Sequence, residues 1–394
     1  MAFLLGDESF LESCSSIPVR KPFDGRTIDY LDSVSKRILS DPASRAYPDV
    51  VTFAFWIRKA SMASYAETYA EKDGCRTVGR GVVFHVAPSN VAVNFAYSLV
   101  SGLISGNVNI VRVPSKPFPQ VDMIADAMRS ALEEFSDMSG YVCLVRYGHD
   151  RDINDRLSAL ADVRVVWGGD DTISVFRESP LKPRATEILF ANRFSLAVID
   201  SDAYMAIPDK KRVAQDFYND TYLTDQNACS SPKAIVWLGK AKEGAKKEFW
   251  HYVHELVSER YGFQQIQGVE KYLQVCLTAT ELKGARREPS EDNLITRVRL
   301  ESLGKDVIDR FGNSGLFMEY DAADISEIRE ICDDSRCQTV TYIGDPSMFE
   351  PLLSSGLKGV DRIVPFGRSM DFELVWDGYD LMSHLTRIVR IRDR

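Results

Sequence analysis

The sequence has 394 residues, 45% of them hydrophobic, so it can bury a large core, and its length indicates two or more domains. Its formal net charge is −9, with acidic and basic residues mixed along the chain, which argues against nucleic acid as a partner. Seven scattered cysteines favour a reducing, cytoplasmic location, and no apolar stretch approaches the roughly 20 residues that span a membrane.

The first half of the chain predicts helices followed by a parallel sheet. Residues 26–72 should be helical, because Tyr30, Leu31, Val34 and Ile38 recur at helical spacing. Short apolar runs then alternate with amphipathic segments. They predict strands at 81–87, 108–113, 141–146 and 163–167, separated by helices at 91–104, 119–136 and 151–160. This alternation is typical of a sheet with helices on both faces.

The second half begins after a strand at 196–199, and we place a boundary near residues 201–208. Beyond it we expect a strand at 234–238, helices at 243–260 and 294–311, and strands at 315–320 and 338–343. The predicted domains are therefore 1–203, 204–368 and a C-terminal tail at 369–394.

Two loops follow predicted strands at the carboxyl edge of the first sheet, where open α/β sheets bind ligands. One is Pro88-Ser89-Asn90, and the other is Trp167-Gly168-Gly169, which opens a helix. The sequence contains no GxGxxG fingerprint. A two-glycine turn at a helix start can host a phosphate, but it is a weak signal by itself.

Cys229 lies in the polar stretch Asp225-Gln226-Asn227-Ala228-Cys229-Ser230-Ser231-Pro232. A buried structural cysteine usually has apolar neighbours, whereas a thiol in a polar turn can be exposed and held as the nucleophilic thiolate. The alternative is a small buried residue. The pattern favours a nucleophile that carries an acyl group.

A metal site is not predicted. His251 and His254 have helical spacing, but no third ligand follows at a spacing typical of zinc.

The order of these segments resembles the aldehyde dehydrogenase superfamily, and most closely its LuxC-type acyl-CoA (fatty acyl) reductases. The resemblance covers roughly residues 78–394. It rests on these segments: Gly81 to Asn90, Gly106 to Lys116, Val166 to Gly169, Gln226 to Pro232, Asp361 to Gly367, and Trp376 to Gly378. It implies two Rossmann-like α/β domains preceded by helices: an NADP-binding domain within 1–203 and a catalytic thiol domain at 204–368.

The resemblance also assigns the catalytic residues. Cys229 falls at the position of the family's nucleophile. Asn90 matches the side-chain donor for the oxyanion that forms on the substrate, and the Cys229 backbone N–H is the natural second donor. A helix N-cap is the alternative role of Asn90.

The resemblance further implies a nicotinamide cofactor. Arg112 matches a lysine that contacts the adenosine ribose. Ser115 stands where NAD-preferring members tend to have an acid, and Lys116 follows, which favours NADPH because a carboxylate would repel its 2′-phosphate. Pro88, Gly168 and Gly169 complete the predicted cofactor-binding residues. Asp170 and Asp171 are good helix-start residues but poor neighbours for a phosphate.

Phe190 occupies the position at which aldehyde dehydrogenases carry the glutamate that activates water. Glu187 is three residues away along a strand and faces the other side. An acyl-enzyme without this base can survive to be reduced. The sequence therefore predicts NADPH-dependent reduction of an acyl thioester, acyl-CoA or acyl-carrier, to an aldehyde through acyl-Cys229.

Two alternatives stay open: an oxidising aldehyde dehydrogenase with another acid as its base, and a non-redox acyl-carrying subunit partnered with an acyl ligase. An acyl ligase or acyltransferase is also a candidate partner for the reductase. The final segment, Arg387 to Arg392, alternates charged and apolar residues. An edge strand of this type commonly pairs with another subunit, and the resemblance likewise implies a homo-oligomer.

Overall fold

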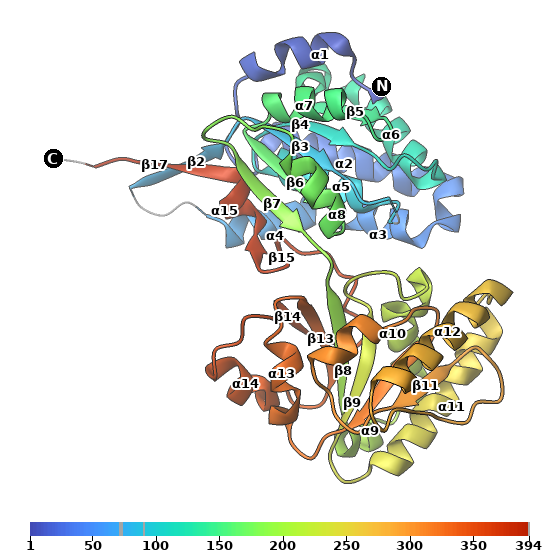
Figure 1. Cartoon of the computed structure of the whole chain (residues 1–394). Helices are drawn as coiled ribbons and strands as arrows, with labels where there is room; N and C mark the ends of the chain where they lie inside the picture. The colour runs from blue at the N-terminus through green and yellow to red at the C-terminus, as the bar shows by residue number, and fades with distance from the viewer. Residues whose placement is uncertain (71–73, 90, 393–394) are drawn as a thin grey trace. The chain divides into compact units, whose positions relative to one another are not determined.

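The computed structural model describes residues 1–70, 74–89 and 91–392. The chain forms two compact units, each with its own sheet (Figure 1). The first unit combines Met1–Ala191 with Leu374–Arg394, and the second is Asn192–Glu373. The prediction of two α/β domains with helices at the N-terminus is confirmed.

The first boundary lies earlier than expected. Residue 203 falls inside a helix of the second unit, whereas the first unit ends at Ala191. The reason is that the strand Phe194–Asp200 hydrogen-bonds to strands of the second sheet and not to the first.

The second boundary also differs, because the segment after Glu373 is not a separate tail. It returns to the first unit, where Leu374 and Met382 join the hydrophobic core. The first unit is thus built from two separate parts of the chain.

The first unit holds a six-stranded sheet in the order β1-β5-β4-β3-β6-β7, parallel except for β1. Its strands and α-helices are β1 (Ala2–Leu5), α1 (Glu8–Ser13), α2 (Gly25–Ser40), α3 (Pro48–Trp56), α4 (Lys59–Thr68), β2 (Cys75–Gly79), β3 (Val82–Val86), α5 (Asn94–Ile104), β4 (Val108–Arg112), α6 (Pro119–Leu132), β5 (Val142–Arg146), α7 (Arg151–Leu160), β6 (Val163–Trp167), α8 (Asp170–Arg177), β7 (Thr186–Phe190), β15 (Val375–Trp376), β16 (Tyr379–Asp380), α15 (Leu381–Leu385) and β17 (Thr386–Arg390).

The centre of this sheet follows from continuous apolar runs. All five residues of β3 are buried, as expected of a parallel strand covered on both faces. The helix α2 begins after the N-cap Asp24, which accepts from the Thr27 N–H, and buries Tyr30, Leu31, Val34 and Ile38, as the helical spacing predicted.

The C-terminal strand β17 pairs antiparallel with β2 of the same chain, so that Ile388 lies opposite Thr77. The two strands form a separate two-stranded sheet beside the main one (Figure 1). Ile388 and Ile391 are exposed. The predicted edge strand therefore exists, and its partner here is internal.

The second unit holds a seven-stranded sheet in the order β10-β11-β12-β9-β8-β13-β14, parallel except for β10. Its strands and α-helices are β8 (Phe194–Asp200), α9 (Ser201–Ala206), α10 (Lys210–Asp220), β9 (Pro232–Leu238), α11 (Lys242–Arg260), α12 (Gln265–Glu281), β10 (Arg286–Arg287), β11 (Thr296–Arg299), β12 (Leu316–Asp321), α13 (Arg329–Cys332), β13 (Cys337–Ile343), α14 (Glu350–Ser354) and β14 (Arg362–Pro365).

The prediction of a helix at 294–311 is wrong. This segment contains β11 and a 3₁₀ helix at Lys305–Arg310. Thr296 and Val298 are buried while Arg299 is exposed, so the segment follows the two-residue period of a strand, and β11 pairs with β12.

Among the described residues, we find no helix with the length and hydrophobicity that a bilayer crossing requires.

Candidate active site

Cys229 lies in a turn between the 3₁₀ helix Tyr222–Thr224 and the first residue of β9. Asp225 and Gln226 both have left-handed backbone conformations, with φ of 51° and 60°. Such conformations are uncommon for residues with a side chain and persist when neighbouring contacts enforce them.

The Gln226 side chain supplies these contacts. Its Nε2 donates to the carbonyls of Pro232 (2.8 Å) and Leu316 (3.2 Å), and its Oε1 accepts from the Gly315 N–H (2.9 Å). Since Gln226 is buried, the bonds tie the turn to β9 and β12 from inside.

The backbone of Cys229 is fixed as well. Its carbonyl accepts from Ser195 Oγ on β8 at 2.7 Å, and the same Oγ accepts from the Thr339 N–H of β13. The turn thus sits at the amino ends of adjacent parallel strands. Its backbone is anchored by the sheet while the Cys229 side chain is exposed.

Exposure separates Cys229 from the other six cysteines, all of which lie in the described residues and are buried or partly buried. Burial raises the pKa of Cys143 to about 12, and a hydrogen bond with Cys332 together with burial raises the pKa of Cys337 well above its usual value. Such thiols are poor nucleophiles because the thiolate is the reactive form.

A second set of hydrogen bonds holds the segment around Gly367, which is one of the segments on which the resemblance rests. The carboxylate of Asp220, at the end of α10, accepts from the Gly367 N–H (2.7 Å), the Ser369 N–H (3.0 Å) and Ser369 Oγ (2.8 Å). Burial raises the pKa of Asp220 to about 6. These contacts therefore have a structural role: they hold the backbone of this segment in place.

The predicted cofactor residues gather at one edge of the first sheet. Val86 of β3 lies beside Arg112 of β4 and Val166 of β6, so Pro88, Arg112 and Gly168 emerge at the carboxyl ends of neighbouring strands. The chain proceeds from β3 outward through β4 and β5 on one side, and through β6 and β7 on the other. Such a reversal of strand order is where open α/β sheets bind ligands.

Arg112 is a half-buried cation at this edge. Its guanidinium lies 4.8 Å from the centre of the Tyr147 ring, and Nη2 donates to the Gly148 carbonyl (3.1 Å). Ser115 and Lys116 are exposed in the loop that follows β4. A fixed cation beside an exposed hydroxyl and a lysine fits an adenosine phosphate.

The two-glycine turn fits a close approach of a pyrophosphate. Gly169 is the N-cap residue of α8, and the Gly168 N–H donates to the Phe190 carbonyl (3.1 Å). A Cβ on Gly168 would fall 2.8 Å from Thr172 Cγ2, so a larger residue there would require the Thr172 side chain to move. Asp170 and Asp171 stand in the first turn of α8 as predicted.

Phe190 ends β7 in an aromatic stack. Its ring lies 3.6 Å from the Trp167 ring, centroid to centroid and nearly parallel, and meets Tyr379 edge-on at 5.6 Å. Glu187 is engaged elsewhere, because its Oε1 accepts from Nε of the buried Arg164 (2.9 Å). The strand therefore presents no free carboxylate at either position.

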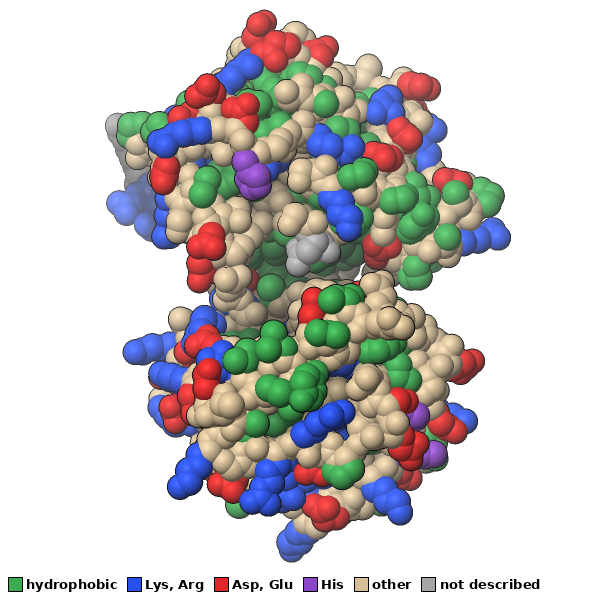
Figure 2. All heavy atoms as spheres, turned by 45° about the vertical axis from the view of Figure 1, so that its right-hand side comes forward, with side chains coloured by type: hydrophobic (Ala, Val, Ile, Leu, Met, Phe, Trp, Pro, Cys, Tyr) green, Lys and Arg blue, Asp and Glu red, His purple; other side chains and the backbone are tan. Residues whose placement is uncertain are grey.

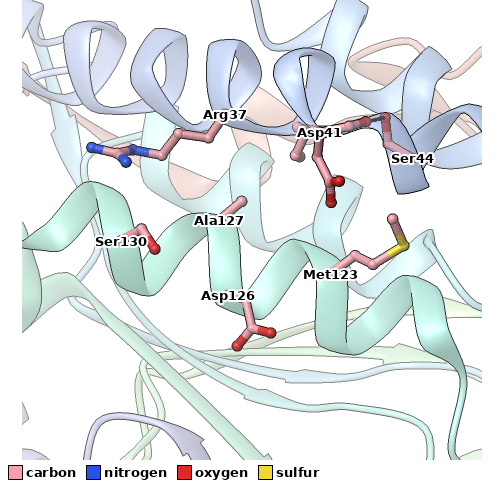
Figure 3. Close-up of a pocket in the computed structure, with 8 residues that line it drawn as sticks. Arg37, Asp41, Ser44, Met123, Asp126, Ala127 and Ser130 are labelled. Carbon is pink, nitrogen blue, oxygen red and sulfur yellow. Dashed lines mark hydrogen bonds between the residues drawn. The ribbon is translucent and has the colours of Figure 1, made fainter.

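Asn90 lies outside the described residues. His254 pairs with Asp292 (2.8 Å), and the part of the chain that is described holds no cluster of three metal-ligating side chains. An open pocket of about 230 Å³ between α2 and α6 involves none of the predicted site residues (Figure 3). It is lined by Arg37, Ile38, Asp41, Ser44, Met123, Asp126, Ala127 and Ser130.

Sequence reasoning missed Lys233. It is the second residue of β9 and the one charged residue in that strand, and it is buried. A lone lysine in an otherwise apolar strand four residues after the proposed nucleophile is the signal that could have identified it.

Comparison with known proteins shows which family the chain belongs to. The chain matches the acyl-CoA reductase (LuxC) family over residues 58–263. It is 23% identical over 323 residues to a long-chain acyl-protein thioester reductase of Aliivibrio fischeri, covering 79% of this chain and 63% of the relative. A second such protein, from Photobacterium leiognathi, is 24% identical over 320 residues, covering 80% and 64%. The chain thus spans less than two thirds of the length of these relatives.

Solved structures show the same fold at low identity. An aldehyde dehydrogenase from Brucella melitensis biovar abortus 2308 superimposes with a TM-score of 0.65 at 14% identity, over 98% of this chain and 89% of the other. Aldehyde dehydrogenase 21 from Physcomitrella patens gives a TM-score of 0.68 at 10% identity, over 97% and 89%. The chain therefore belongs to the LuxC acyl-CoA reductase family and has the fold of the aldehyde dehydrogenase superfamily.

Proposed function

We propose that this protein reduces an acyl thioester to an aldehyde with NADPH, through an acyl group carried on Cys229. The observation that carries the proposal is an exposed thiol on a fixed turn of the second unit, and a further support is an aromatic stack in the first unit at the position where the resemblance expects a water-activating glutamate. The first feature allows acyl transfer to the enzyme, and the second disfavours hydrolysis of the acyl-enzyme before it is reduced.

The chemistry proceeds in two stages. The Cys229 thiolate attacks the thioester carbonyl carbon, and the bond to the coenzyme or carrier sulfur breaks. Hydride addition to the acyl carbon gives a hemithioacetal anion, whose collapse breaks the Cys229 S–C bond and releases the aldehyde. The developing oxyanion needs fixed donors, for which we propose the Cys229 N–H and Asn90.

NADPH supplies the hydride when bound. We propose that Pro88, Gly168 and Gly169 contact the cofactor at the carboxyl edge of the first sheet, and that Arg112, Ser115 and Lys116 hold its adenosine phosphate. The support is their common position at the strand-order reversal and the lack of an acid at residue 115.

The relatives are named for long-chain acyl groups carried on a protein. We therefore propose a fatty acyl thioester as substrate, delivered as acyl-CoA or by an acyl ligase or acyltransferase partner. We also propose that the protein acts in the cytoplasm as a homo-oligomer.

Mass spectrometry of the intact protein tests the nucleophile. Wild type, Cys229→Ala and Cys276→Ala are incubated with acyl-CoAs of increasing chain length. Cys276 is a partly exposed cysteine on α12 and provides the matched control. We expect an acyl adduct on wild type and Cys276→Ala and none on Cys229→Ala, with NADPH discharging the adduct as aldehyde.

An adduct that persists in Cys229→Ala contradicts the proposal. Rapid formation of free acid from aldehyde and NADP without an added thiol would indicate an oxidising dehydrogenase. An adduct that forms in a protein unable to bind NADPH would indicate an acyl-carrying subunit.

A further inference from the structure

Lys233 is a buried cation directly beneath the Cys229 turn. Only 8% of its surface is exposed, although lysine is almost never this buried without a partner. The other residues of β9, from Pro232 to Leu238, are apolar and buried. Burying an ammonium carries a large desolvation cost, so its contacts indicate what compensates for it.

Both hydrogen bonds of the ammonium lead to the turn. The Nζ donates to the Gln226 carbonyl and to Asn313 Oδ1. Asn313 in turn donates through Nδ2 to Asn227 Oδ1 at 2.8 Å. The lysine thus holds the turn on the amino side of Cys229, directly at the Gln226 backbone carbonyl and, through the Asn313 amide, at the Asn227 side chain.

The ammonium also interacts electrostatically with the thiol. Burial lowers the pKa of Lys233 to about 7, and Cys229 is the titratable group that raises it again. The interaction is reciprocal: a thiolate that favours the protonated amine is itself favoured by that amine. The two bonds fix the position of the Lys233 amine relative to the turn, and the amine carries a positive charge there when it is protonated.

We propose that Lys233 is a positioning residue for Cys229: it holds the turn from inside and, when protonated, supplies a positive charge that favours the thiolate. This inference rests on the proposed function, in which the Cys229 thiolate attacks the thioester. The family comparison does not assign this residue. The proposal explains why a lysine occupies an otherwise apolar strand at this position.

Alkylation of Cys229 by iodoacetamide, followed between pH 5 and pH 10, tests the charge. Residue-specific labelling is read by mass spectrometry in wild type, Lys233→Met, Lys233→Arg and Lys240→Met. Lys240 is an exposed lysine just after the same strand and controls for net charge. We expect Lys233→Met to raise the midpoint by about one pH unit and to slow labelling roughly tenfold below it, while Lys240→Met matches wild type. Lys233→Arg should retain the lower midpoint.

A reciprocal measurement covers the case in which Lys233→Met does not fold. Competitive acetylation of Lys233 is followed against pH in wild type and Cys229→Ser, a substitution at an exposed position. Because serine carries no charge, the lysine should titrate at lower pH in the variant. An unchanged Cys229 midpoint in folded Lys233→Met, or an unchanged Lys233 titration in Cys229→Ser, overturns the inference.

These outcomes are separable from the proposed function. If the alkylation midpoint of Cys229 depends on Lys233 but Cys229 accepts no acyl group, the inference stands and the proposed reductase activity is refuted. Acylation of Cys229 with a midpoint indifferent to Lys233 would do the opposite.

Discussion

Environment, and not residue type, distinguishes the reactive groups at the residue scale. All seven cysteines have the same side chain, yet Cys229 is the one among them that is exposed, and it lies on a fixed turn. Lys271 shows the same principle: burial lowers its pKa to about 8, and its Nζ donates to the Ser314 carbonyl (2.8 Å). The Ser314 N–H donates to the Asp225 carbonyl (2.9 Å), so this second buried lysine supports the Cys229 turn indirectly.

Ser115→Glu should change cofactor preference. A carboxylate at this position would repel a 2′-phosphate, so we expect NADPH to bind about tenfold more weakly while NADH binds as well or better. Quenching of tryptophan fluorescence on titration measures both affinities.

Ser139→Glu is the matched control for this change. Ser139 is exposed before the start of β5, at the opposite edge of the same sheet. Equal NADPH affinity in Ser115→Glu and wild type would contradict the proposed place of the adenosine phosphate.

At the element scale, Asn107 joins three parts of the first unit. Its Oδ1 accepts from the N–H groups of Arg80 (2.7 Å) and Gly81 (3.1 Å), and its Nδ2 donates to the Leu385 carbonyl (2.9 Å). The side chain is fully buried between the turn after β2, the start of β4 and the end of α15. The sequence marked this residue only through the family resemblance.

Asn107→Ala should destabilise the first unit by about 2–4 kcal/mol, because it leaves buried backbone groups without partners. Asn107→Asp keeps an acceptor for Arg80 but loses the donor to Leu385, so its effect should be smaller at acidic pH, where the carboxyl is protonated. Urea denaturation measures both variants. A loss below 0.5 kcal/mol, the usual range for surface substitutions, would show that the bonds are dispensable.

The sequence was most informative where hydrophobic patterns are simple. Continuous apolar runs such as β3 identified the strands, and the polar neighbours of Cys229 predicted its exposure, which is confirmed.

The pattern of α12 is inverted: Gln267, Lys271 and Thr278 are buried, whereas Val269 and Leu273 are exposed. Periodicity cannot identify such a helix, since it assumes that apolar side chains face inward. Figure 2 shows hydrophobic side chains gathered on the surface of the second unit.

The structural roles of Lys233 and Gln226 could not be predicted from the sequence for a related reason. Their partners, Asn313 and Gly315, lie about 80–90 residues further along the chain, as the hydrogen bonds show. Local patterns carry no information on such contacts. The catalytic role of Cys229 and the cofactor residues remain predictions that the family resemblance supports.

At the scale of the whole molecule, the sheet of β2 and β17 stands apart from both main sheets. A two-stranded sheet is marginally stable by itself, and unpaired strand edges attract further strands. This arrangement supports the prediction that copies of the chain associate through β17.

The double substitution of Ile388 and Ile391 by glutamate should break this association, because both side chains are exposed on or just after β17. Light scattering after size exclusion should give a multiple of the chain mass for wild type and a single mass for the variant. Val175→Glu, at an exposed position on α8, is the control. An unchanged mass in the Ile388 and Ile391 variant would place the interface elsewhere.

The division of the first unit between both ends of the chain has a consequence for biosynthesis. The second unit is continuous from Asn192 to Glu373 and can fold as soon as it leaves the ribosome. The Met1–Ala191 part of the first unit is translated earlier, but Asn107 gains the Leu385 carbonyl as a partner only after residues 374–390, which contain α15 and β17, have been made. The first unit is therefore begun before the second unit and completed after it, and a nascent chain that stalls before Leu374 leaves the first unit incomplete for chaperones to protect.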